Sequence, residues 1–121
     1  MNGDKNDVKY RAYILALKTI AFVDSLNKKD LVSQILLKQL IRSTTSIGAN
    51  VVEAQAGSST KDFINFLSYA LKSANESKFW FCLLRDSKKA PKNTVGPLLL
   101  ETTDLAKMLD SSIITLRKKN K

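Results

Sequence analysis

The sequence predicts an all-α protein, an up-down-up-down four-helix bundle. Apolar residues recur at three- and four-residue steps, which is the helical period, over four stretches of the chain. Short connections separate these stretches, and long helices joined by short connections pack as antiparallel neighbours. No stretch shows the two-residue alternation of a strand. An array of extended helices is the competing architecture.

The first two predicted helices span about residues 7–26 and 31–56. Asp30 precedes the second helix and suits an N-cap, because its carboxylate can accept from a free backbone N–H. Gly57 is a natural helix stop. The apolar positions are Val8, Leu15 and Phe22 in the first helix and Leu36, Leu40, Ile47 and Val51 in the second.

The third and fourth predicted helices span about residues 60–88 and 94–117. Ser59, followed three residues later by Asp62, resembles a capping box. Pro97 is tolerated because it falls in the first turn of the fourth helix. With a basic tail at 117–121, residues 1–121 make a single domain. The apolar positions are Phe63, Leu67, Ala70, Ala74, Phe81 and Leu84, then Leu98, Leu105, Leu109, Ile113 and Leu116.

Composition places the chain among soluble globular proteins. It has 121 residues, of which 44% are hydrophobic, enough for one core and too few residues for two typical domains. No apolar run approaches the ~18 to 20 residues of a membrane span, and the first ten residues lack the apolar stretch of a signal peptide. We therefore expect a cytoplasmic protein.

The residue types that most enzymes need are missing. The chain has no histidine, which excludes Ser-His-Asp and Cys-His catalysis and imidazole-based zinc sites. No phosphate-cradling glycine loop is present. The single cysteine, Cys82, lies between Phe81 and Leu83, which favours an inert packed thiol over a reactive one. We expect no enzymatic activity and no cofactor.

A polar line interrupts the second helix. Arg42, Ser46, Asn50 and Glu53 recur every three or four residues. Because the second and third helices turn back on each other near residues 57–60, Arg42 should lie level with Glu76. We expect these two residues to pair in the groove between the helices, with the serine and asparagine hydrogen-bonded along the same seam.

A metal site built from these carboxylates is the competing interpretation. In the antiparallel register Glu53 lies about 12 residues from the level of Glu76, which is about 18 Å at the helical rise. Two carboxylates so far apart cannot share an ion. The polar line is therefore interpreted as structural.

Each predicted helix also carries consecutive apolar residues, and three neighbours on a helix span about 200°, more than the ~100° stripe that a bundle core needs. Phe79, Trp80 and Phe81 are the strongest case, since aromatic residues are enriched at subunit contacts. Scattered exposed apolar residues are normal in monomers. Because every helix has a second seam, we expect self-association with these three aromatics at the interface.

Most of the net charge of +9 lies in two clusters, +3 over residues 85–92 and +4 over residues 117–121. Cations near helix C-termini stabilise the helix dipole and keep a protein soluble. Basic patches also attract nucleic-acid phosphates without a sequence code. The candidates for phosphate binding are Lys28, Lys29, Arg85, Lys88, Lys89, Lys92, Arg117, Lys118, Lys119 and Lys121.

The segment QLIRSTTSIGANVVEAQAGSSTKDFINFLSYALKSANESKFW resembles the bacterial four-helix bundle family of rRNA intervening-sequence proteins. The resemblance rests on the polar line from Arg42 to Glu53, the restart at residues 59–63 and residues 73–76. It implies a homo-oligomer, a ring-shaped pentamer of bundles. It also implies kinship with the accessory variability determinant of diversity-generating retroelements, a basic pentameric barrel that binds nucleic acid and its reverse transcriptase.

The leading hypothesis is a non-enzymatic, basic, oligomeric bundle that binds RNA or DNA through phosphate contacts, as an accessory to RNA processing or reverse transcription. Five copies of one basic patch would form a basic ring. A protein-interaction scaffold with no nucleic-acid role is the alternative. A carboxylate enzyme is the weakest of the three hypotheses, because acid-base partners are missing.

Overall fold

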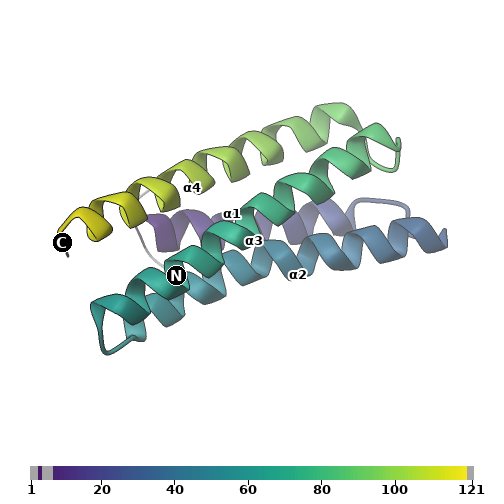
Figure 1. The fold of residues 1–121 in the computed structure, drawn as a ribbon. Coiled ribbons are helices and arrows are strands. Elements are labelled where there is room, and N and C mark those ends of the chain that lie inside the picture. Colours follow the sequence, from purple (N-terminus) through teal and green to yellow (C-terminus); the bar gives the residue numbers. More distant parts are fainter. Residues whose placement is uncertain (1–2, 4–6, 120–121) are drawn as a thin grey trace.

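The computed structural model describes Gly3 and residues 7–119, and this part of the chain forms four α-helices and no strand. The helices are α1 (Val8–Asp24), α2 (Leu31–Ala56), α3 (Thr60–Asp86) and α4 (Lys92–Lys119). They run alternately up and down, and each packs on its two neighbours around the bundle (Figure 1). The α1–α2 and α3–α4 connections lie at one end, and the α2–α3 connection and the C-terminal end of α4 at the other (Figure 1). The all-α fold with four helices is confirmed.

Side-chain N-caps begin the first three helices. Asp7 accepts a hydrogen bond from the backbone N–H of Lys9 at 2.9 Å. Asp30 accepts from the N–H of Ser33 at 3.0 Å, and Ser59 from the N–H of Asp62 at 3.1 Å. Each cap satisfies a donor that the first helical turn leaves unpaired. The caps of α2 and α3 are the residues that the sequence predicts.

The end of α3 is built around a lysine in the left-handed conformation. Lys88 has a φ of 62°, and its N–H donates to the carbonyl of Arg85 at 3.1 Å. The N–H of Lys89 donates to the carbonyl of Leu84 at 3.0 Å, the pair of bonds that closes a Schellman motif. Because a glycine usually holds this position, the sequence gives no stop signal here. The helix therefore ends at Asp86, two residues before the predicted end.

The core lies between the four helices, and it includes Phe81. The ring of Phe81 is 0% exposed and packs against Phe22 of α1, with centroids 6.2 Å apart. The prediction that Phe81 lies at an oligomer interface is therefore wrong. None of the helices in the described part of the chain combines the length and the apolar character needed to cross a membrane. The largest fully buried apolar side chains are Phe81, Leu15, Leu40, Ile47, Leu84, Leu105, Leu109, Val51 and Val95.

Candidate nucleic-acid interface

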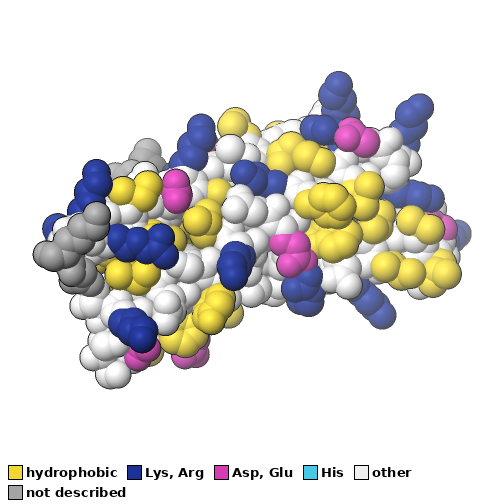
Figure 2. All heavy atoms as spheres, in the orientation of Figure 1, with side chains coloured by type: hydrophobic (Ala, Val, Ile, Leu, Met, Phe, Trp, Pro, Cys, Tyr) yellow, Lys and Arg dark blue, Asp and Glu magenta, His cyan; other side chains and the backbone are white. Residues whose placement is uncertain are grey.

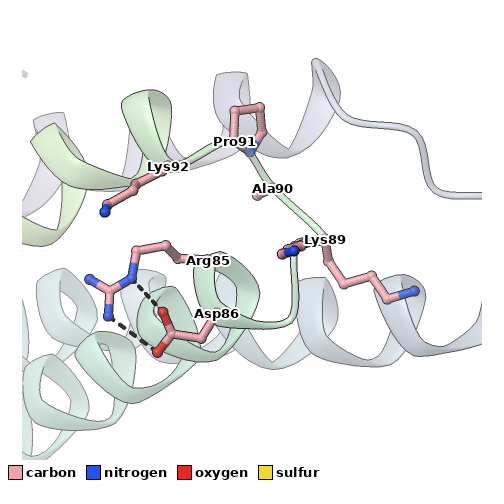
Figure 3. Close-up of a pocket in the computed structure, with 7 residues that line it drawn as sticks. Arg85, Asp86, Lys89, Ala90, Pro91 and Lys92 are labelled. Carbon is pink, nitrogen blue, oxygen red and sulfur yellow. Dashed lines mark hydrogen bonds and ion pairs between the residues drawn. The ribbon is translucent and has the colours of Figure 1, made fainter.

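An open pocket lies at the end of the bundle where α3 turns into α4 (Figure 3). Four cationic side chains and one carboxylate line it. Its position follows from the sharp end of α3 and from the start of α4 immediately after Pro91. The lining residues are Arg85, Asp86, Lys88, Lys89, Ala90, Pro91 and Lys92.

Arg85 and Asp86 form a two-pronged ion pair inside this pocket. The Nε of Arg85 lies 2.8 Å from Oδ1 of Asp86, and Nη2 lies 3.3 Å from Oδ2. The hydrogen bond from Arg85 lowers the pKa of Asp86, and the nearby Lys92 lowers it further. Arg85 and Lys92 extend toward the same side of the pocket, whereas Lys89 extends away from them (Figure 3). The positive charge at this side exceeds the negative charge.

Lys28 and Lys89 have structural partners. Lys89 Nζ lies 3.0 Å from Oδ2 of Asp30, the N-cap of α2, and the hydrogen bonds from Ser33 and then Lys89 hold the pKa of Asp30 well below its usual range. Lys28 Nζ donates to the carbonyls of Val23 at 2.9 Å and Leu26 at 3.0 Å, at the C-terminal end of α1. For Lys28 the helix-end interpretation of the charge agrees with the geometry, whereas Lys89 forms an ion pair with the N-cap of α2.

Lys29, Lys88 and Lys92 have no side-chain partner among the described residues. All three are exposed. Since Lys89 contacts Asp30, the α1–α2 connection that carries Lys29 adjoins the α3–α4 connection. The structure thus brings the predicted cations of residues 28, 29 and 85–92 to one end of the bundle, and it leaves three of them without a side-chain partner among the described residues.

The second basic cluster lies apart from the first. Arg117, Lys118 and Lys119 are exposed in the last turn of α4. Because α4 has 28 residues, its two ends are about 40 Å apart at 1.5 Å per residue. Lys121, the other predicted binding residue of the tail, lies outside the described residues. The basic clusters are therefore two separate surfaces in one chain.

The polar line of α2 meets α3 in a shared seam. Arg42 forms an ion pair with Glu76, as the antiparallel register predicts. The Oγ atoms of Ser46 and Ser73 are 3.0 Å apart, and Asn50 Nδ2 donates to the carbonyl of Ser46 at 2.9 Å. The side chain of Glu53 is exposed and forms no hydrogen bond or ion pair with the described residues, so its predicted place in the seam is wrong. It projects to solvent because the seam ends one turn earlier, at Asn50.

Two contacts of the seam were missed in the sequence. The buried hydroxyl oxygens of Ser43 and Ser77 lie 2.9 Å apart, and the indole N–H of Trp80 donates to Oε2 of Glu76 at 2.8 Å. The antiparallel register that pairs Arg42 with Glu76 places Ser43 level with Asn75, two residues from Ser77, so the register alone does not predict this contact. The Trp80 bond follows from the four-residue spacing to Glu76 on one helix face.

The described residues contain no cluster of three or more carboxylate or cysteine side chains that could hold a metal ion. Cys82 is a free, half-buried thiol. Glu76, the carboxylate considered for a metal site, is instead occupied by Arg42 and Trp80.

Comparison with known proteins identifies the chain's relatives. The family model described as 23S rRNA-intervening sequence protein matches residues 4–111. The chain is also similar to the crystal structure of a protein of unknown function from the S23 ribosomal protein family of Bacteroides thetaiotaomicron VPI-5482. The TM-score is 0.81 at 35% sequence identity, over 88% of this chain and 98% of the other. No protein with curated annotation matches the chain. The chain belongs to the 23S rRNA-intervening sequence protein family.

Proposed function

We propose that this protein is a non-enzymatic nucleic-acid-binding bundle that holds RNA or DNA by its phosphates. The binding surface is the end of the bundle formed by the α1–α2 and α3–α4 connections. The role is that of an accessory to RNA processing or reverse transcription in the cytoplasm. The description of the family, which refers to 23S rRNA, favours RNA as the ligand.

The observation that carries this proposal is the set of exposed cations around the α3–α4 pocket. Lys29, Lys88 and Lys92 have no ion pair among the described residues, and Arg85 adds a guanidinium that is only partly engaged by Asp86. Phosphate groups supply charge-assisted acceptors for such donors. A pocket that is open to solvent suits a polymer backbone better than an enclosed small molecule.

The test is the salt dependence of RNA binding, measured by fluorescence anisotropy with a labelled oligonucleotide. For single strands the logarithm of the binding constant falls by about 0.7 per phosphate contact for each tenfold rise in salt. We expect a slope that corresponds to three or more contacts. Binding that does not change with salt, or no binding at low salt, would contradict the proposal.

We also propose that the protein self-associates, as a ring of bundles. Tyr13, Leu17 and Ile20 are exposed on α1 at i, i+4 and i+7, so they form one apolar stripe on the outside of the bundle. Exposed apolar stripes of this kind are typical of subunit contacts. Light scattering should give a mass of several chains, and Leu17→Glu should lower it. A monomer at every protein concentration would contradict self-association.

A protein-interaction scaffold is the competing function, and Phe79 is the residue that favours it. Its side chain is 58% exposed, which suits a partner's apolar pocket. Nuclease treatment separates the two functions. A partner protein that stays bound after nuclease treatment would favour the scaffold, whereas loss of the partner would favour binding through nucleic acid.

A further inference from the structure

We propose that Phe79 and Trp80 form a stacking platform for the bases of single-stranded nucleic acid whose phosphates lie in the α3–α4 pocket. This inference rests on the proposed function and deepens it, because it names the strand state of the ligand. Base faces are hidden inside a duplex, so a stacking platform selects single strands.

Phe79 offers a ring that nothing in the described chain covers. Its exposed fraction of 58% exceeds that of the other exposed aromatics, Tyr69 and Tyr13. The planes of the Phe79 and Trp80 rings meet at 76° in a T-shaped contact, with centroids 5.0 Å apart. The two rings are therefore not stacked face to face, and more than half of Phe79 stays exposed. Tyr69 is less available, because the ammonium of Lys72 lies 5.8 Å from its ring centroid.

The polar groups beside the platform hold Trp80 in place, and they neutralise the nearby carboxylate of Glu76. Trp80 is tied by its indole N–H to Glu76, and Glu76 is tied in turn to Arg42 of α2. The indole therefore cannot rotate without breaking a hydrogen bond. Because Arg42 compensates the carboxylate, an approaching phosphodiester meets no unpaired anion beside the ring.

The platform lies on α3, and the basic pocket begins at the C-terminal end of that helix, at Arg85 and Asp86. Phe79 precedes Asp86 by seven residues, about 10 Å at the helical rise. That is about three nucleotides at ~3.4 Å for each stacked nucleotide. Figure 2 shows hydrophobic side chains on the half of the visible face nearer the α3–α4 connection, at the right of the view, with Lys and Arg side chains around them. The net charge of +9 favours a polyanion as the ligand of this surface.

The test uses a 12-nucleotide single strand and a blunt duplex of the same sequence at low salt, with the emission of Trp80, the single tryptophan, as a built-in reporter. The single strand should quench this emission, and Phe79→Leu should weaken single-strand binding by about fivefold or more while duplex binding stays unchanged. Tyr69→Leu, the matched change at an exposed aromatic on the same helix, should leave both affinities unchanged.

Other outcomes would overturn the inference. If Phe79→Leu bound the single strand as tightly as the wild type while Lys88→Glu bound it more weakly, the stacking platform would be refuted and the phosphate site would be supported. A lower mass by light scattering for Phe79→Leu, with unchanged affinity, would assign the ring to a subunit contact. If the wild type bound neither oligonucleotide, both the platform and the proposed function would fail.

Discussion

Arg42 of α2 and Glu76 of α3 form an ion pair across the α2–α3 groove, although 34 residues separate them in the sequence. Each residue has a further partner. The Nε of Arg42 donates to Oε1 of Gln39 at 2.9 Å, and Glu76 accepts from Trp80. The pair thus belongs to a four-residue network on the surface of the bundle. It also shows the register in which α2 packs against α3.

The Arg42–Glu76 pair should contribute modestly to stability. The two side chains are 56% and 36% exposed, so solvent screens their attraction. We expect Arg42→Ala to lower the free energy of unfolding by about 0.5 to 1 kcal/mol, measured by urea denaturation. A double-mutant cycle with Glu76→Gln should give a coupling of the same sign. Unchanged stability in Arg42→Ala would show that the pair has no stabilising role.

The buried Ser43–Ser77 contact should be intolerant of larger side chains. An Oγ–Oγ distance of 2.9 Å between two short side chains requires close approach of α2 and α3. We expect Ser77→Val to lower the free energy of unfolding by about 1 to 3 kcal/mol, because added methyl groups would force the helices apart. Ser111→Val, at an exposed serine of α4, controls for the lower helix propensity of valine. Equal losses in the two variants would contradict close packing at Ser77.

The left-handed conformation of Lys88 should cost stability. At a φ of 62° a side chain with a Cβ is disfavoured by about 1 kcal/mol relative to glycine. We expect Lys88→Gly to be more stable than Lys88→Ala by about this amount in thermal and urea unfolding. Both variants remove the same charge, so the difference between their free energies of unfolding measures the cost of the left-handed backbone. Equal stability would mean that the left-handed turn is absent in solution.

Asp30 should make the bundle sensitive to acid. Its pKa in the folded state lies below the ordinary value of 3.8, owing to the hydrogen bonds from Ser33 and Lys89. A lowered folded-state pKa adds stability above the unfolded-state value, and this stability is lost as the pH falls below about 3.8. Asp30→Asn keeps a capping oxygen and removes the charge. The wild type should therefore have a higher free energy of unfolding than Asp30→Asn at pH 7, and this difference should disappear in acid. A difference that is constant with pH would contradict the prediction.

Helical periodicity and antiparallel register were enough to predict the fold and part of the site. They place four helices, two N-caps and the Arg42–Glu76 pair, because each depends on local spacing and on one turn of known position. Phe81 is a residue for which three consecutive aromatics are a misleading signal. Its neighbour Phe79 is exposed, whereas Phe81 lies at helical spacing from Ala74, Ser77 and Leu84, which belong to one buried stripe.

The ends of the bundle were harder to predict than its sides. α3 ends at a left-handed residue that is Lys88 and not the usual glycine, so the sequence contains no signal for this end. α4 begins two residues before the predicted start. The partners of the basic residues also depend on contacts between distant connections, as with Lys89 and Asp30. Composition gives the amount of charge, whereas only the three-dimensional arrangement separates the paired lysines from the open ones.

Charge reversal at the α3–α4 pocket tests the central claim most directly. The measurement is the anisotropy of a labelled single-stranded RNA, titrated with the wild type, Lys88→Glu/Lys92→Glu and the control Lys61→Glu/Lys107→Glu, which has the same net charge. We predict that the pocket variant loses affinity and that its salt slope falls by about 1.4, the value for two lost phosphate contacts, while the control keeps most of the slope. Equal losses in the two variants would contradict a phosphate site at this end of the bundle.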